Sequence, residues 1–258
     1  MTAVDDRVLV LTYHSIAAAP GPTSIAAETF RMQLDELDRL GYRSLTVADF
    51  VAWRSAPAAA GGRKVLLTFD DGFADFAAAA HPLLREHGRS ALVFLPTGRI
   101  GGSEDWAGAP QPGRRLLDWG AVRELAGAGI EFGAHGVTHA DLTELPVEAR
   151  RAEIAACGRA LAAELGVPTR CFAAPYGRVD RGVVADIAAC YELSFGTRFG
   201  HARRDDPRCE LPRIEMHYFR ERRRWRDFLA GRHGYFHFRR ALRGAGIAAR
   251  GVLATVRG

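Results

Sequence analysis

The stretch Val65-Leu66-Leu67-Thr68-Phe69-Asp70-Asp71-Gly72 decides how the rest of this chain is interpreted. Its apolar part follows Gly61-Gly62 and has the length of a strand buried on both faces. Two adjacent carboxylates end the run, and they repel each other unless a positive charge lies nearby. The pair therefore indicates either a metal ion, with one aspartate as ligand and the other free to act as a base, or an ordinary turn, because Asp-Gly is common turn chemistry.

The length and composition of the chain fit one globular domain. With 258 residues, 48% of them hydrophobic and 25% charged, it can bury a full core, and α/β barrels reach this size as single units. The short apolar run Val8–Tyr13 does not make a signal peptide, and no run approaches the roughly 20 apolar residues that span a bilayer. Four widely spaced cysteines without a paired motif favour reduced thiols. We therefore expect a cytoplasmic protein.

Short apolar runs alternate with helical patterns along the chain. Strands are expected over residues 8–13, 65–69, 91–95, 130–134, 171–174, 193–196 and 211–214, and helices over residues 30–40, 47–53, 73–87, 118–126, 146–165 and 180–190. Pro82 should kink or split the third of these helices. The alternation predicts parallel βαβ units, while the absence of a Gly-x-Gly-x-x-Gly or Walker-type loop disfavours nucleotide-binding folds.

Polar residues directly follow several of these strands. In a (β/α) barrel the carboxyl ends of the strands share one face, where active sites are built. The residues that the pattern places there are His14, Asp70, Asp71, His135 and Tyr176. An irregular loop over residues 96–113 is long for a compact domain, and such loops are more often functional than idle. The sequence therefore predicts a barrel with one site at this face.

Two histidines four residues apart strengthen the metal interpretation. In His135-Gly136-Val137-Thr138-His139 the imidazoles would share a face of one helical turn and could bind one ion together. Two histidines and one carboxylate leave open positions on a metal for water and substrate, as a hydrolytic site requires. The alternative is a pair of surface histidines that recur at this spacing by chance, and the presence of the Asp70-Asp71 pair elsewhere in the chain weighs against it.

Three segments together resemble the polysaccharide deacetylase family, also called the NodB-homology or carbohydrate esterase family 4 group. They are residues 68–72, 135–139 and 172–177 (Phe-Ala-Ala-Pro-Tyr-Gly), in family order and with family-like intervals. The resemblance runs from about Val8 to Ile214. It implies a distorted (β/α) barrel of about seven strands, a divalent metal, and removal of acetyl from an N-acetylated sugar. We expect a catalytic domain over residues 1–219 and a basic helical tail over residues 220–258.

The resemblance also implies roles for particular residues. Asp70 matches the catalytic base, and the metal ligands would be Asp71, His135 and His139. Zinc is the default metal for this ligand set, and cobalt or nickel would fit it too.

The resemblance places further residues at the substrate groove. Pro175 and Tyr176 match its wall, and the Tyr176 backbone N–H is a candidate oxyanion donor. In the long loop, Trp106 is expected to be exposed and could stack on a sugar ring. Trp119 lies just beyond that loop, and core packing is an equal or better interpretation for it.

The chain departs from the family pattern at three places. Gly136 stands where the second motif usually has Ser or Thr, so a supporting hydrogen bond is expected to be missing. Ala173 stands where the third motif usually carries an arginine that orients the base. Arg213, from the last strand, is the candidate replacement, and the alternative is a surface arginine that follows a proline. The late Leu-x-His motif of the general acid is not clearly present, because Glu215 occupies its apolar position beside His217.

We expect His14 to be the general acid instead, with His217 as the second candidate. Residues 11–14 resemble the start of the family branch that includes the biofilm poly-N-acetylglucosamine deacetylases, in which an N-terminal histidine takes this role. The structural alternative is that a lone histidine after a strand is more often part of the packing. In the expected mechanism Asp70 takes a proton from the attacking water, and His14, as imidazolium, protonates the departing amine.

Positive charge is concentrated near the C-terminus. Residues 220–258 hold eleven arginines against Glu221 and Asp227, about +9, whereas the whole chain carries +5, so the first 219 residues carry about −4. Aromatic residues are interleaved with these arginines. The composition suits an amphipathic helix on an anionic membrane. It also suits solvated helices that pack their aromatics onto the barrel, and nucleic-acid phosphates are the least favoured partner.

The sequence thus predicts a metal-dependent carbohydrate N-deacetylase. Its substrate would be an N-acetylated amino sugar in a polysaccharide, oligosaccharide or glycan precursor, and its location cytoplasmic, with peripheral contact at the inner face of the membrane as a further option. Two alternatives stay open. One is an amide hydrolase with a non-sugar substrate on the same scaffold, and the other is a glycan-binding pseudoenzyme with a membrane-docking tail.

Overall fold

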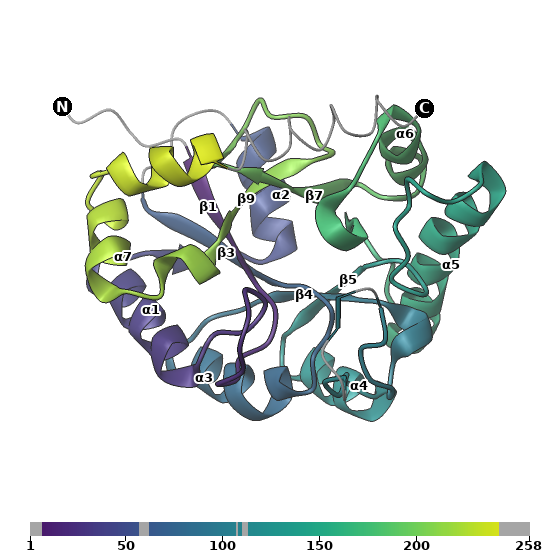
Figure 1. Ribbon diagram of the computed structural model, residues 1–258, viewed down its shortest axis with the longest axis horizontal. Coiled ribbons are helices and arrows are strands. Elements are labelled where there is room, and N and C mark those ends of the chain that lie inside the picture. The colour runs from purple at the N-terminus through teal and green to yellow at the C-terminus, as the bar shows by residue number, and fades with distance from the viewer. Residues whose placement is uncertain (1–6, 57–61, 107, 110–112, 243–258) are drawn as a thin grey trace.

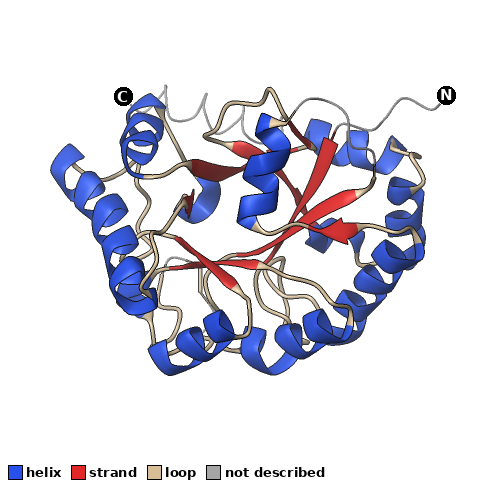
Figure 2. Ribbon diagram, turned by 180° about the vertical axis from the view of Figure 1, so that it is seen from behind, coloured by secondary structure: helices blue, strands red, loops and turns tan. Residues whose placement is uncertain are grey.

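Seven parallel strands close into a barrel that is surrounded by helices (Figures 1 and 2). The computed structural model describes residues 7–56, 62–106, 108–109 and 113–242. The ring closes because β1 pairs with both β3 and β9. In order around the ring, its strands are β1 (Arg7–Tyr13), β3 (Lys64–Phe69), β4 (Leu92–Leu95), β5 (Glu131–Ala134), β6 (Cys171–Ala173), β7 (Leu193–Phe199) and β9 (Leu211–Glu215). The predicted (β/α) barrel of about seven strands is confirmed.

Two short strands were not expected from the sequence. β2 (Arg43–Ser44) pairs with β3, and β8 (Ala202–Arg203) pairs antiparallel with the start of β1. Each has only two residues, and a segment of that length shows no hydrophobic period that a sequence could reveal.

Apart from α2 (Val47–Ser55), which covers one end of the barrel, the helices lie on the outside of the ring, as the alternating pattern predicted (Figure 2). These outer helices are α1 (Ala27–Arg39), α3 (His81–Glu86), α4 (Trp119–Gly127), α5 (Val147–Leu165), α6 (Arg181–Cys190) and α7 (Arg222–Leu229). Asp118 and Asp180 cap α4 and α6 by accepting backbone hydrogen bonds, and Gly166 ends α5 in the left-handed conformation. Pro82 lies in the first turn of α3, where a π-helical turn (η1, Phe76–Ala80) precedes it, so the split expected there is present.

Alternation along the strands divides the apolar side chains into two clusters. Leu9, Leu11 and Tyr13 of β1 point outward and belong to the large cluster between strands and helices. Val8 and Val10 point inward and belong to a smaller cluster that fills the barrel. Helix α2 contributes to this inner cluster and covers one end of the barrel (Figure 1). The opposite end, where the strands finish, is left for polar side chains.

The chain after β9 is part of the same packed body. Trp225 on α7 is fully buried, and its indole nitrogen donates a hydrogen bond to the backbone carbonyl of Gln33 on α1 (3.1 Å). Phe228 and Phe236 join the large cluster, and residues 234–242 form a further helical segment. Trp225, Phe228, Tyr235 and Phe236 of the basic tail therefore pack onto the barrel, as one interpretation of the sequence predicted, whereas Phe238 is exposed. Residues 243–258 of the basic tail, which include Arg243, lie outside the described residues. Over the described ranges, every helix is too short or too polar to cross a lipid bilayer.

Candidate active site

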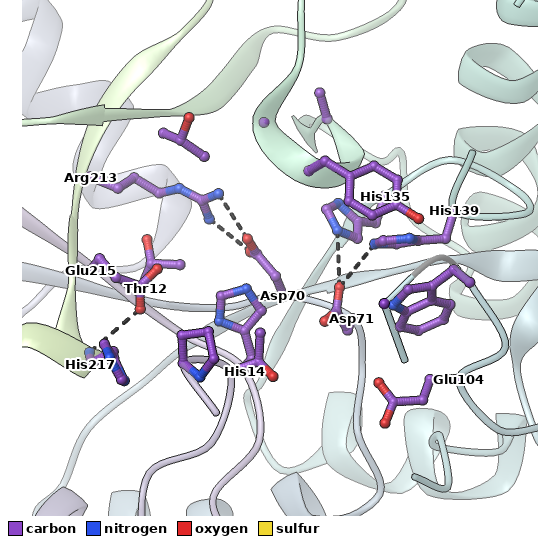
Figure 3. A pocket seen from close by; sticks show the side chains of 18 of the residues that line it. Thr12, His14, Asp70, Asp71, Glu104, His135, His139, Arg213, Glu215 and His217 are labelled. Carbon is purple, nitrogen blue, oxygen red and sulfur yellow. Dashed lines mark hydrogen bonds and ion pairs between the residues drawn. The ribbon is translucent and has the colours of Figure 1, made fainter. Parts of the chain in front are cut away.

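The inward side chains at the strand ends line a cavity of about 430 Å³ (Figure 3). The two-residue period that points Leu66 into the barrel also points Thr68 and Asp70 inward, where Arg213 donates a hydrogen bond to each. The same period applies to Thr12 and His14 after Val10, and to Arg213 after Leu211. Ordinary strand geometry thus gathers residues that lie far apart in the sequence.

Asp70 and Arg213 form a two-pronged ion pair inside the barrel. The two terminal nitrogens of Arg213 donate to the two carboxylate oxygens of Asp70 at 2.7 and 2.8 Å, and both side chains are buried. Arg213 Nε donates to the carbonyl of Gly196 (2.9 Å), which fixes the plane of the guanidinium. Burial alone would raise the pKa of Asp70, but the positive charges of Arg213 and His135 outweigh it and lower the pKa. The structure therefore holds Asp70 ionised and oriented.

Asp71 lies against two histidine rings. Its Oδ1 is 3.3 Å from His135 Nε2 and 3.1 Å from His139 Nε2, and all three side chains are buried. Burial would raise the pKa of Asp71, but hydrogen bonds from His135 and His139 hold it well below its usual value. Burial lowers the pKa of His139 more than its hydrogen bond to Asp71 raises it. Burial also acts to lower the pKa of His135, but the hydrogen bond to Asp71 and the charges of Asp70 and Asp71 outweigh it and raise that pKa, so a cation bound there would take the place of the His135 proton. An ionised carboxylate and a neutral imidazole are the forms that bind a metal.

These three residues fit a divalent cation. One ligand atom from each lies within 4.8 Å of the other two. His135 Nδ1 donates to the carbonyl of Ala173 (2.7 Å), which turns Nε2 toward Asp71, as in metal sites where the second ring nitrogen binds a backbone carbonyl. The donor set of one carboxylate and two imidazoles is that of an open zinc-type site.

The backbone bends unusually at the site. Four non-glycine residues among those described have positive φ angles, and three of them are site residues: Asp71 (72°), His139 (64°) and Tyr176 (59°). Successive side chains in a strand point in opposite directions, so the left-handed turn at Asp71 and Gly72 is what brings the Asp71 carboxylate to the same cavity as Asp70. Such strain concentrates at functional sites.

The segment from His135 to His139 is a loop, not a helical turn, which corrects the sequence expectation. Positive φ angles at Gly136 (76°) and His139 (64°) bend it so that both rings reach Asp71. Glu153, on α5, holds the loop. Its carboxylate accepts hydrogen bonds from the backbone nitrogens of Val137 (2.7 Å) and Thr138 (2.9 Å) and from the Thr138 hydroxyl (2.8 Å).

Glu153 also explains Gly136. A Cβ at position 136 would lie 3.2 Å from the Glu153 carboxylate, and the backbone conformation there favours glycine. The sequence predicted that a hydrogen bond is missing here, because the family usually has Ser or Thr where this chain has Gly136. Glu153 on α5 accepts hydrogen bonds from the same loop instead. A carboxylate in a long surface helix carries no local signal of this role, so the sequence did not reveal it.

Both candidate acids line the cavity. His14 is half-buried, and its positive charge contributes to the lowered pKa of Asp70 and of Asp71. Figure 3 shows its ring between the Asp70 carboxylate and His217. Burial and the charges of Arg220, Arg239 and His14 lower the pKa of His217. His217 is therefore harder to protonate than a histidine in water.

His139 is enclosed by two aromatic rings. Trp106 stacks on it (centroids 4.1 Å apart, planes at 27°), and Tyr176 meets it edge-on at 4.8 Å. Trp106 is half-buried, which corrects the expectation that it is exposed, and one face of its ring is covered by His139. Tyr176 is 40% exposed at the cavity.

Pro175 and Trp119 take supporting positions. Pro175 is buried and is not one of the described residues that line the cavity, so it supports the groove wall instead of forming its surface. Its ring would lie 3.6 Å from a Cβ at Gly136, beneath the histidine loop. Trp119 packs against the large cluster, in agreement with the core interpretation.

A clamp that the sequence did not reveal closes one wall of the cavity. Arg114 donates to both carboxylate oxygens of the buried Glu104 (2.6 and 2.8 Å) and also to the hydroxyls of Thr23 (3.0 Å) and Ser24 (2.8 Å). Its guanidinium lies over the Phe73 ring. The long loop is thereby tied to the segment after β1, and loop length was its only sequence signal.

Comparisons with known proteins agree with this geometry. The family described as polysaccharide deacetylase matches residues 58–192. YxkH of Bacillus subtilis (strain 168), provisionally named a polysaccharide deacetylase, is 24% identical over 211 residues, which are 81% of this chain and 71% of that protein.

Solved structures share the fold. The Streptococcus pyogenes deacetylase PplD in complex with acetate is 24% identical and superposes with a TM-score of 0.70 over 81% of this chain and 91% of that chain. IcaB from Ammonifex degensii is also 24% identical, with a TM-score of 0.69 and the same coverage. The de-N-acetylase from Aggregatibacter actinomycetemcomitans is 17% identical, with a TM-score of 0.68 over 81% and 95% of the two chains.

Proposed function

Because this chain belongs to the polysaccharide deacetylase family, we propose that it is a metal-dependent hydrolase that removes the N-acetyl group from an N-acetylated amino sugar. The sugar would be part of a polysaccharide, an oligosaccharide or a glycan precursor. One observation carries the proposal: a single cavity holds an ionised, oriented carboxylate, Asp70, next to three buried metal-ligand side chains.

The proposed metal ligands are Asp71, His135 and His139. Zinc is the first candidate for this donor set, and cobalt or nickel would also suit it. When bound, such a cation would supply Lewis-acid polarisation of the acetamide carbonyl and a water of lowered pKa.

Asp70 is the proposed general base. Its low pKa keeps it ionised at neutral pH, and Arg213 fixes its plane. A carboxylate has about four lone-pair positions, so two bonds to Arg213 leave acceptor capacity for the proton of the attacking water. Arg213 therefore acts through Asp70 as a positioning residue, in the place of the arginine that the third motif lacks.

His14 is the proposed general acid. An amide nitrogen leaves only when it is protonated, so the acid must carry a proton at working pH. The lowered pKa of His217 makes it poorly suited to this task, and His14 lines the same cavity. The Tyr176 backbone N–H, at the kink in η3 (Pro175–Gly177), is the proposed donor to the oxyanion that forms on the acetyl carbon.

The free cysteines bear on the cellular location of the protein. All four cysteines are free, and reduced thiols are usual in the cytoplasm. We therefore propose a cytoplasmic location.

A substrate panel tests the proposed function. Acetate release from N-acetylglucosamine oligomers should exceed amine release from simple linear and cyclic amides. Turnover of the simple amides alone would favour an amide hydrolase with a non-sugar substrate. Binding of the oligomers without turnover, by protein loaded with metal, would favour a glycan-binding pseudoenzyme.

A further inference from the structure

The helical segment 234–242 has a buried side and an apolar exposed side. Phe236 is buried and packs on Phe199 (ring centroids 4.9 Å apart) and Phe228 (5.3 Å). Phe238 and Leu242, four residues apart and thus one above the other on a helix, are 58% and 48% exposed. They are two of only five large hydrophobic side chains exposed in the described part of the chain. Packing in the core therefore does not explain why Phe238 and Leu242 are apolar.

Two arginines lie on the same segment. Arg239 precedes Leu242 by three residues and borders the exposed side, whereas Arg240 follows Phe236 by four residues and lies on the side of Phe236. Their guanidinium groups rest on the rings of Tyr218 and Phe236, and neither has an acidic partner among the described residues. The sequence contains no Asp or Glu after Asp227. Nothing on this segment offsets their charge.

Several arginines earlier in the tail have acidic partners. Arg222 and Arg226 of α7 donate to the buried carboxylate of Glu36 on α1, at 2.9 and 2.8 Å. Arg232 pairs with Asp227. The two pairs with Glu36 fasten the tail to the barrel, and the Arg232 pair lies within the tail. Residues 234–242 therefore follow a helix that is held to the barrel, and the positive charges of Arg239 and Arg240 are not paired with a carboxylate of the described residues.

We propose that Phe238, Leu242, Arg239 and Arg240 form a docking surface for an anionic lipid membrane. The exposed apolar pair would enter the boundary between headgroups and acyl chains. The long side chains of Arg239 and of the exposed Arg240 would extend to the headgroup phosphates. Each basic residue near an anionic surface strengthens binding about fivefold. This surface adjoins the catalytic cavity, because Arg239 rests on Tyr218, which lines it.

An anionic membrane fits these residues better than a nucleic acid. Single-stranded nucleic acid would also meet arginines, but its bases stack on planar aromatic faces, and Leu242 offers none. A bilayer accommodates a phenylalanine and a leucine equally. The inference concerns membrane binding and does not depend on the proposed deacetylation.

Vesicle co-sedimentation of the full-length protein tests the proposal. We expect binding to vesicles of phosphatidylcholine with phosphatidylglycerol, and much weaker binding to pure phosphatidylcholine. The double substitution Phe238→Ser/Leu242→Ser should weaken binding at least about tenfold. Arg239→Gln/Arg240→Gln should remove most of the preference for phosphatidylglycerol. Val167→Ser is the matched control, because Val167 is 59% exposed elsewhere on the surface, and it should bind like the wild type.

Three results would overturn the proposal. The first is that the wild type does not bind anionic vesicles. The second is that Val167→Ser loses as much vesicle binding as the double serine variant. The third is that the wild type binds a short single-stranded RNA and the double serine variant binds it equally well. Because Phe238 and Leu242 are exposed, the double serine variant should keep the wild-type melting temperature. Its acetate release from a soluble oligomer should also be unchanged, which separates membrane binding from catalysis.

Discussion

Arg213 and Asp70, 143 positions apart in the sequence, share two hydrogen bonds of 2.7 and 2.8 Å inside the barrel. Arg213 stands in β9 and Asp70 directly follows β3, and both strands flank β1. The pair joins the carboxylate of the proposed base to the last strand of the ring. We propose that β9 in this way supplies the arginine that the third motif lacks at Ala173.

Removing the arginine should damage both stability and turnover. Arg213→Met leaves Asp70 buried without its partner, which should cost about 3–5 kcal/mol of unfolding free energy. Because the pKa of Asp70 would then rise and its orientation would be lost, kcat should fall about 10²-fold or more. Urea unfolding and acetate release measure the two effects. In the Asp70→Asn background, Arg213→Met should lower the unfolding free energy much less. An equal loss in the two backgrounds would show that Arg213 and Asp70 do not stabilise each other.

Glu153 should matter for metal affinity although it does not reach the metal ligands' binding atoms. Glu153→Gln removes a carboxylate that accepts three hydrogen bonds from the histidine loop, so the affinity should fall about 10- to 100-fold. Competition with a chelator and the absorption spectrum of bound cobalt measure this directly. Glu164→Gln, on the same helix with an exposed partner in Arg123, is the control. Equal affinity in both variants would remove Glu153 from this role.

Substitution of the two candidate acids, His14 and His217, should lower kcat to different extents. His14→Gln should lower kcat by about 10²–10⁴-fold because the departing amine loses its proton donor. His217→Gln should have a smaller effect, since its lowered pKa leaves it mostly neutral at working pH. Both variants should still bind one metal per chain. A larger loss of kcat in His217→Gln would exchange the two assignments.

Glu36 should stabilise the tail in a pH-dependent way. Burial would raise its pKa, but hydrogen bonds from Arg39, Arg226 and Arg222 outweigh burial and lower it. A carboxyl group with a lowered pKa stabilises the fold above its unfolded value, about 4.3, and this stabilisation is lost as pH falls through the folded value.

Glu36→Gln should therefore cost about 1–2 kcal/mol at neutral pH, discounted for the solvent-exposed arginines. The difference from wild type should shrink below about pH 4. Urea unfolding at the two pH values measures it. Glu86→Gln, which removes an exposed pair with Arg31, should leave the unfolding free energy nearly unchanged. A pH-independent difference for Glu36→Gln would contradict the assignment.

The sequence predicted those parts of the fold that depend on local pattern. The strands of the barrel ring are apolar runs, and Asp118, Asp180 and Gly166 mark helix ends through hydrogen bonds and backbone conformations that act within a few residues. Because strand ends converge in a barrel, the same pattern also gathered the candidate site residues on one face.

What the sequence could not show depends on contacts between distant segments. The left-handed turns at Asp71 and His139 depend on the structure around them, because neither residue type demands a positive φ. The hydrogen bonds from Glu153 and the clamp between Arg114 and Glu104 join segments whose packing no local period encodes. The stacking of Trp106 on His139 likewise appears only when the long loop is folded over the site.

The most direct test of the proposed function follows metal and acetate together. The protein is stripped with a chelator and reloaded with zinc, and both bound metal and acetate release from N-acetylglucosamine oligomers are measured for the wild type and for Asp70→Asn. We predict that both bind one metal per chain, that acetate release by the wild type requires the metal, and that Asp70→Asn is slower by at least about 10²-fold. Equal rates in the two proteins, or full release by the stripped wild type, would contradict the account.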